Sequence, residues 1–181
     1  MDRRFVVVSG LPGSGKSTLS VGLSPILGLP VIDKDNVLER LFDAKGMGGP
    51  AWRRALSRES DLLFRAEAER SSGAILVSFW NLPGMPPHSG TPTDWLPGLS
   101  RRIVNLHCEC PPRIAAARYW QRRRHAGHLD DGRSREEVLE TIEGVAGLRP
   151  PEVGPRVRCD TSFEVDLALL ARNISAALGR A

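Results

Sequence analysis

A glycine-rich stretch at residues 10–18 has the residue types and the spacing to bind phosphate. It follows the apolar run at residues 5–8 and leads into a segment that reads as a helix, which is the context that the pattern Gly-x-x-x-x-Gly-Lys-Ser requires. Glycines let backbone N–H groups converge on phosphate oxygens, and a helix N-terminus adds partial positive charge. We therefore expect a nucleoside triphosphate, ATP or GTP, to bind here. The expected binding residues are Gly10, Leu11, Pro12, Gly13, Ser14, Gly15, Lys16, Ser17 and Thr18.

Two residues of this loop and two nearby aspartates could do the chemistry. Lys16 can reach the β- and γ-phosphates, and the Ser17 hydroxyl can bind Mg²⁺. Asp33 and Asp35 end a short apolar strand, at the sheet edge where open α/β sheets bind ligands. A carboxylate there can accept the proton of an attacking hydroxyl. Asp33 competes with Asp35 for that role or holds Mg²⁺ through water, and Asp35 has the alternative role of capping the next helix.

The elements that would position these side chains alternate along the chain. The expected strands are the apolar run at residues 5–8 and residues 28–32, 74–79, 102–108 and 157–159. The expected helices are residues 15–23, 51–71, 111–124, 134–145 and 163–178. One more helix is expected after the second strand, capped by Asp35 or Asn36 and ending near Ala44. This alternation predicts a parallel sheet with helices on both faces. Residues 81–92 read as a long loop, which in a compact domain is typical of a functional or a disordered segment, and residues 125–133 read as a flexible segment.

Composition is that of an ordinary globular protein. The chain has 181 residues, of which 41% are hydrophobic and 25% charged, which suits one domain over residues 1–181. Three cysteines do not suggest a disulfide framework, and no apolar run has the length of a membrane span or a signal peptide, so we expect a cytoplasmic protein. The net charge of +4 fits either a phosphate site or a nucleic-acid partner.

A basic segment follows the fourth expected strand. Arg118 and Arg122 are spaced i and i+4, so a helix would carry both on one face. Guanidinium groups can stabilise the charge that develops on γ-phosphate oxygens during phosphoryl transfer. The alternative is a solvated basic face, and we assign Arg123 and Arg124 to it.

Taken together, residues 10–18, the aspartates at 33 and 35 and this arginine helix resemble the small P-loop kinases. The resemblance is to the chloramphenicol phosphotransferase type, the 5′-hydroxyl polynucleotide kinase domain and the zeta-toxin-like kinases. It implies a three-layer α/β fold with a five-stranded parallel sheet in the order 2-3-1-4-5, and a lid at about residues 118–133. It also implies that Asp35 is the catalytic base and that Arg118 and Arg122 contact the phosphates.

The chain departs from a common pattern at the end of the third expected strand. Many P-loop enzymes carry an aspartate there that supports Mg²⁺, whereas this chain has no carboxylate in residues 77–81. The metal would then depend on Ser17, waters and Asp33 or Asp35. Ser78, Trp80 and Asn81 become candidates for substrate contacts, and we expect residues 46–52 and 81–95 to line the acceptor pocket.

Two classes of function agree with these residues. The first is an ATP-dependent phosphotransferase whose acceptor is the hydroxyl of a small molecule, or alternatively the 5′-hydroxyl of a polynucleotide. A small molecule is favoured because the chain has one tyrosine and no aromatic–basic platform on which single strands stack. The second class is a nucleotide-binding regulator or NTPase, which the missing strand-three carboxylate supports.

Overall fold

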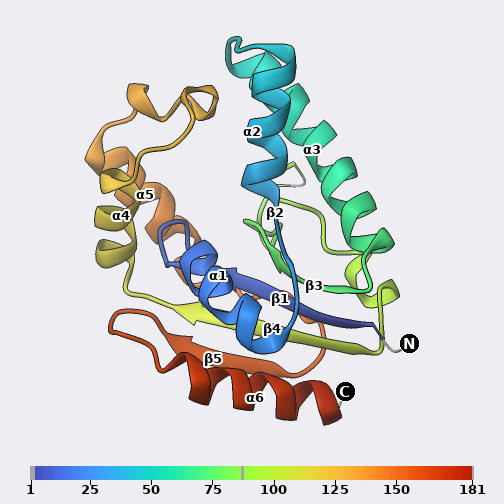
Figure 1. The fold of residues 1–181 in the computed structure, drawn as a ribbon. Coiled ribbons are helices and arrows are strands. Elements are labelled where there is room, and N and C mark those ends of the chain that lie inside the picture. The colour runs from blue at the N-terminus through green and yellow to red at the C-terminus, as the bar shows by residue number, and fades with distance from the viewer. Residues whose placement is uncertain (1–2, 87, 181) are drawn as a thin grey trace.

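A computed structural model describes residues 3–86 and 88–180 and shows a parallel sheet between helices (Figure 1). The five strands are β1 (Arg4–Gly10), β2 (Val31–Asp33), β3 (Gly73–Val77), β4 (Arg102–Glu109) and β5 (Arg156–Asp160). All neighbours pair in parallel, in the order β2-β3-β1-β4-β5. The expected fold and strand order are confirmed. Pro87 of the expected loop and both ends of the expected 1–181 domain lie outside the described residues.

The described part of the chain contains six α-helices, five of which lie between strands while the sixth follows β5. They are α1 (Lys16–Leu27), α2 (Lys34–Lys45), α3 (Pro50–Arg70), α4 (Pro112–Gln121), α5 (Arg135–Ala146) and α6 (Leu167–Arg180). Short 3₁₀ turns occur at Leu96–Gly98, Ala126–His128 and Asp130–Gly132. None of the helices in the described residues is long and apolar enough to cross a membrane.

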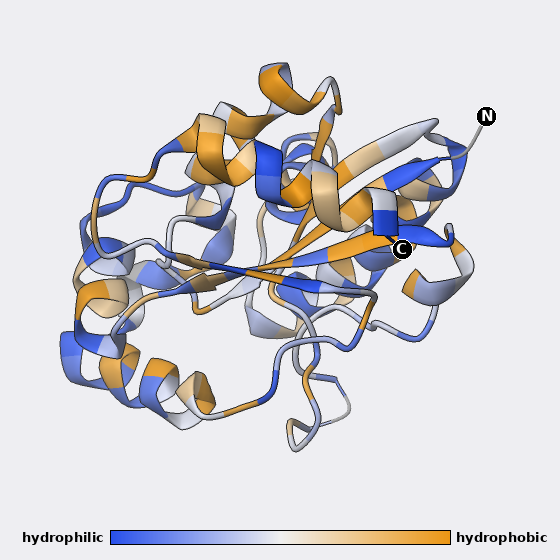
Figure 2. Cartoon of the chain, turned by 90° about the horizontal axis from the view of Figure 1, so that it is seen from below, coloured by the Kyte–Doolittle hydropathy of each residue, from blue (hydrophilic) through white to orange (hydrophobic). Residues whose placement is uncertain are grey.

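The central strand β1 is buried on both faces, and its side chains divide the core in two. Val6 and Val8 pack with side chains of α1 and α6, whereas Phe5 and Val7 pack with Phe64 of α3. This follows from the strand period of two, which points successive residues to opposite faces. In Figure 2 the strands at the centre are accordingly hydrophobic along most of their length. The sheet is thus covered on both faces, and its carboxyl edge carries the loops that concern function.

The helix boundaries differ from expectation at two places that matter for the site. Helix α2 begins at Lys34, and its N-cap is Asp33, whose side chain accepts a hydrogen bond from the Asp35 backbone N–H. The expectation that Asp35 or Asn36 caps this helix is therefore wrong, because Asp33 already supplies the capping oxygen. Asp35 lies in the first turn, and its side chain is left available for other contacts.

The second difference is the end of α4, which lies at Gln121 and not near Arg124. Arg122 has an extended backbone (φ −76°, ψ 140°). The expectation that Arg118 and Arg122 share one helical face is therefore wrong. The chain leaves the helix here and turns toward α2, where Arg124 forms two ion pairs that a continued helix would not allow. Smaller differences are a longer α1, which passes Pro25 and ends at Leu27, and a later start of β2 and α6.

Candidate active site

The loop between β1 and α1 has the shape that its glycines predict. Gly13 and Gly15 adopt positive φ angles of 80° and 84°, a region that favours glycine. At Gly13 a Cβ would also lie 2.1 Å from the Ala115 carbonyl oxygen, so α4 approaches the loop too closely for any side chain. The loop therefore depends on glycine both for its turn and for its contact with α4.

Lys16, at the start of α1, lies folded over this loop. Its Nζ donates hydrogen bonds of 2.9 Å to the carbonyl oxygens of Gly10 and Leu11. Burial lowers the pKa of Lys16 to about 8, against which the nearby Cys108 and Asp35 act weakly. A phosphate group beside this ammonium would restore its charge. The lysine is thus positioned for an anion that the loop itself can surround with N–H groups.

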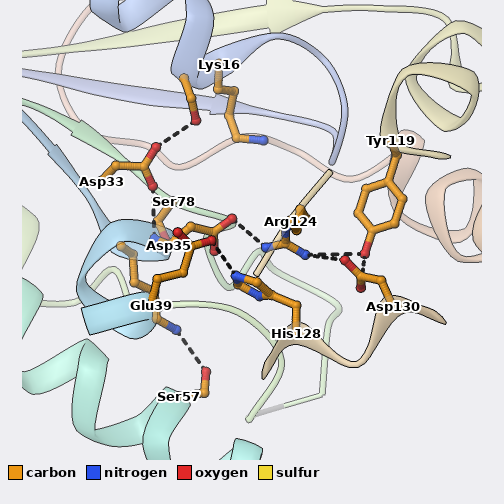
Figure 3. Close-up of polar contacts among 12 residues, drawn as sticks. Lys16, Asp33, Asp35, Glu39, Ser57, Ser78, Tyr119, Arg124, His128 and Asp130 are labelled. Carbon is orange, nitrogen blue, oxygen red and sulfur yellow. Dashed lines mark hydrogen bonds and ion pairs between the residues drawn. The ribbon is translucent and has the colours of Figure 1, made fainter. Parts of the chain in front are cut away.

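A pair of oxygen ligands lies next to Lys16. Ser17 donates a hydrogen bond of 2.7 Å to Asp33, which also accepts the Asp35 N–H at 2.9 Å (Figure 3). Burial raises the pKa of Asp33, and the charge of Asp35 adds to this, while the two hydrogen bonds oppose it. Hydroxyl and carboxylate oxygens are the ligands that Mg²⁺ prefers, and it completes its shell with waters and phosphate oxygens. Ser17 and Asp33 therefore fit the ion, and no strand-three carboxylate is needed for a two-residue site.

Asp35 lies two residues after Asp33 and faces the segment that follows α4. It accepts an ion-paired hydrogen bond of 2.6 Å from Arg124 (Figure 3). Burial alone would raise the pKa of Asp35, but Arg124, and after it His128, outweigh this and hold the pKa below its ordinary value. The carboxylate is therefore ionised at neutral pH, which is the state that a proton acceptor requires.

The structure separates the arginines that the sequence grouped together. Arg118 donates to the carbonyl oxygens of Thr161 and Ser162, in the loop after β5, at 2.8 and 3.4 Å. Arg122 lies over the ring of Tyr119, 4.5 Å from its centroid, and is close enough to Lys16 to lower the pKa of that lysine. The two residues thus line one cleft from different places.

Arg124, assigned above to the solvated face, is the arginine that the sequence analysis missed. Its side chain is 13% exposed, and its guanidinium also pairs with Asp130 at 3.0 Å, next to the Tyr119 hydroxyl (Figure 3). That assignment is wrong for Arg124, because the chain turns after Gln121 and carries it inward. Arg123 is exposed, as expected.

The segment after Arg124 is docked on α2 through polar and aromatic contacts. His128 Nε2 lies 3.0 Å from Glu39 Oε1, and His125 Nε2 lies 3.2 Å from Asp43 Oδ1. Between them the ring of Phe42 stacks on His125 and meets His128 edge-on. This segment, which sequence reasoning took as a flexible stretch, therefore contains two 3₁₀ turns, the first of which packs against the helix that carries Asp35.

Opposite the lid, α3 forms the other wall of a cleft of about 1020 Å³. Lys34 of α2 pairs with Asp61 of α3 at 2.8 Å. Thr91 donates to Asp61 at 2.9 Å and lies 2.6 Å from the Ser78 hydroxyl oxygen. This network joins α2, α3, the end of β3 and the 88–92 segment; of its residues, the sequence analysis named Ser78 and included Thr91 in the expected 81–95 lining, but not Lys34 or Asp61. Its spacing along the chain gives no pattern that sequence reading could have found.

The expected acceptor-lining segments are found in part. His88, Ser89, Gly90 and Pro92 line the cleft, but residues 46–52 do not, and the wall from α3 begins at Arg53. Trp80 is 2% exposed, and its indole N–H donates to the Val8 carbonyl oxygen at 2.8 Å. The proposed substrate contact from Trp80 is therefore wrong, because the ring is part of the core. Asn81 instead binds loop carbonyls, that of Pro86 at 2.9 Å among them.

Comparison with known proteins identifies the family. Residues 5–145 match the family described as AAA domain (AAA_33), which is more than half of the chain. The chain belongs to this family. The match includes the phosphate-binding loop, both aspartates and the arginine segment, so these residues lie within the shared domain.

One curated relative and several solved structures resemble the chain. Shikimate kinase of Corynebacterium glutamicum is 35% identical over 77 residues, which is 39% of this chain and 43% of the relative, so the match spans less than half of that enzyme. A proposed kinase from Chloroflexus aurantiacus has a TM-score of 0.79 at 23% identity, over 98% of this chain and 99% of that one. A gluconokinase from Sinorhizobium meliloti 1021 has a TM-score of 0.56 at 20% identity, over 98% and 92%. At these identities the structural likeness shows a P-loop kinase fold.

Proposed function

We propose that the protein transfers the γ-phosphate of ATP, or GTP, with Mg²⁺ to a hydroxyl group of a small molecule. The observation that carries this proposal is that Lys16 and the ionised Asp35 line the same cleft. A regulator that only binds a nucleotide has no use for such a carboxylate beside its phosphate site. The relatives named shikimate kinase and gluconokinase support an acceptor that is small and hydroxylated.

In this proposal the loop residues 10–18 surround the α- and β-phosphates, and Lys16 binds the β- and γ-phosphates. Ser17 and Asp33 hold Mg²⁺, which neutralises phosphate charge in the transition state. The acceptor oxygen forms a bond to the γ-phosphorus as the bond to the β-phosphate oxygen breaks, so ADP leaves. The hydroxyl proton passes to Asp35.

The arginines receive separate roles in the same proposal. Arg122, next to Lys16, contributes positive charge where the γ-oxygens develop negative charge, as the sequence pattern suggested. Arg118 is tied to the loop after β5 and supports the nucleotide side of the cleft. We also propose that the whole chain forms one kinase domain of the type that the resemblance names, with residues 118–133 as its lid.

The test compares two isosteric variants, Asp35→Asn and Asp33→Asn. Asn at position 35 cannot accept the proton, so kcat should fall by roughly 10²–10⁴-fold while the Kd for Mg-bound ATP changes little. Asn at position 33 still caps α2 but weakens the metal site, so part of its loss should be recovered at high Mg²⁺. Transfer from γ-labelled ATP to a panel of small alcohols, followed by mass, supplies the rate.

Three outcomes would contradict the proposal in different ways. Normal transfer by Asp35→Asn, with Asp33→Asn inactive at every Mg²⁺ concentration, would assign the base to Asp33. Phosphate released only to water, with every alcohol in the panel unmodified, would indicate the NTPase class. Labelling of a 5′-hydroxyl oligonucleotide in place of the small alcohols would favour the polynucleotide kinase.

A further inference from the structure

Helix α3 presents three arginines to the cleft, and the proposed transfer to a hydroxyl does not use them. Arg53, Arg54 and Arg58 all line it, on the wall opposite the lid arginines. Arg54 and Arg58 are spaced i and i+4 and therefore lie on one helical face. Sequence reasoning singled out the arginines of α4 only, so these three are new to the site.

Other charged side chains of the cleft lie next to opposite charges, either within the protein or on the nucleotide that we propose to bind there. Lys34 pairs with Asp61, and Arg124 pairs with Asp35. Lys16 and Arg122 lie beside the phosphate-binding loop, where Mg-bound ATP brings a net charge of about −2.

Among the residues that the structure describes, none of the three α3 arginines forms an ion pair. Within residues 3–86 and 88–180, the carboxylates of the α3 ion pairs engage other cations: Glu59 pairs with Lys45, Glu67 with Arg40 and Glu69 with Arg65. The Nε of Arg53 is buried and makes no hydrogen bond to any described residue. A buried, unpaired donor is unusual in a native protein, and an ordered water or a bound ligand is among its explanations.

We propose that the acceptor carries a phosphomonoester group, which these arginines bind while its hydroxyl is presented to Asp35. This rests on the proposed function and names the substrate class of that site. A phosphomonoester has a charge of about −1.5 to −2 at pH 7 and three acceptor oxygens, which matches several guanidinium groups better than one carboxylate would. Leu38 and Leu62 line the same cleft and provide apolar contact for a short carbon skeleton between the two ends.

The experiment measures binding and not transfer, so that it stays informative if the kinase function is wrong. The phosphate-binding loop is first filled with Mg²⁺ and a non-hydrolysable ATP analogue. Pairs of alcohols with and without a phosphomonoester are then titrated by calorimetry: sn-glycerol 3-phosphate and glycerol, D-ribose 5-phosphate and D-ribose. Inorganic phosphate, D-gluconate and a 5′-hydroxyl oligonucleotide complete the panel.

The phosphorylated members and inorganic phosphate should bind, and the neutral members should not. Affinity should fall below pH 6, where the second phosphate pKa lies and the dianion is lost. Arg58→Gln and Arg54→Gln should each weaken binding by about 10-fold or more, while the Kd of the ATP analogue changes less than 2-fold. Arg70→Gln, at the exposed end of the same helix and outside the cleft, is the matched control and should bind as the parent does.

Each alternative result overturns the inference. Equal binding of neutral and phosphorylated partners would show that the arginines do not select charge. Preference for D-gluconate, without the loss below pH 6, would indicate a carboxylate, and preference for the oligonucleotide would indicate a nucleic-acid end. If nothing in the panel binds to protein that holds the ATP analogue, the phosphomonoester site is absent, whatever the fate of the kinase proposal.

Discussion

At the scale of single residues, burial and neighbouring charges decide the protonation states of the site. Burial lowers the pKa of Lys16 to about 8, and Arg124 is the strongest of the groups that hold the pKa of Asp35 down. The site thus contains an easily deprotonated lysine and a strongly ionised carboxylate side by side. Both properties can be measured without knowledge of the acceptor.

We expect nucleotide binding to take up a proton near pH 8. Lys16 in the free protein is partly neutral there, and the phosphates of ATP raise its pKa, so the fraction that was neutral becomes protonated. The uptake should vanish well below pH 7, where the lysine is already charged. Calorimetry in buffers of different ionisation enthalpy measures it. Lys16→Arg, which stays charged, is the control; equal uptake in both proteins would assign the proton to another group.

Arg124→Gln should move the acid limb of the pH profile of kcat/KM to higher pH. Arg124 stabilises the ionised form of Asp35, so its removal raises the pKa of that carboxyl, and the base is lost by protonation at a higher pH than in the parent. Arg123→Gln, one residue away and exposed, should leave the limb in place. An unshifted limb in Arg124→Gln would mean that the proton acceptor is not Asp35.

At the scale of elements, the proposed lid contacts α2 through a small set of close contacts. The 3₁₀ turn Ala126–His128 packs on Phe42, and His128 and Glu39 lie within hydrogen-bond distance beside it. Helix α2 also carries Asp35 in its first turn. The proposed lid thus contacts the same helix that holds the candidate base.

Gly127→Ala should loosen the lid. A Cβ at this position would lie 2.5 Å from the Phe42 ring, so the segment must shift, at a cost of about 1–3 kcal/mol. Trypsin should then cleave after Arg123 or Arg124 faster than in the parent. Gly132→Ala, whose Cβ would meet nothing within 4 Å, is the matched control. Phe42→Ala in the Gly127→Ala background should relieve the clash; no change in cleavage by Gly127→Ala would argue against tight docking.

At the scale of the whole molecule, the phosphate-binding loop contacts elements from distant parts of the chain. The loop 10–18 starts at the central strand, contacts α4 at Gly13, and faces Asp33 at the start of α2. A ligand held there binds only the folded chain, so it stabilises all of these elements together.

A non-hydrolysable ATP analogue with Mg²⁺ should therefore raise the melting temperature. At 100 times its Kd the analogue adds about 2.7 kcal/mol, which corresponds to roughly 5–11 °C for a chain of this size. Differential scanning calorimetry measures the shift. Lys16→Ala should keep a cooperative transition but lose most of the shift, because the fold does not depend on that ammonium. An equal shift in the variant would remove Lys16 from the phosphate site.

The sequence by itself determined the fold, the phosphate-binding loop and the position of the two aspartates. These features depend on local rules: a period of two in buried strands, glycines at positive φ, and strand ends that meet at one edge of a parallel sheet. The start of α5 is equally local, because Ser134 and Glu137, three residues apart, form a capping box there. Such features can be read because the residues that interact are neighbours in the chain.

The tertiary structure alone decided the rest of the candidate site. Arg124 meets Asp35 across 89 residues, and Lys34 meets Asp61 across 27, so no spacing rule relates them. The end of α4 at Gln121 depends on contacts with α2, which outweigh the helical preference of the arginine run. Trp80 reads as a loop residue in the sequence and is core in the structure. Contacts between distant segments decide where a charged side chain points. The sequence alone does not show this, because the same residue type occurs both at solvated surfaces and in ion pairs.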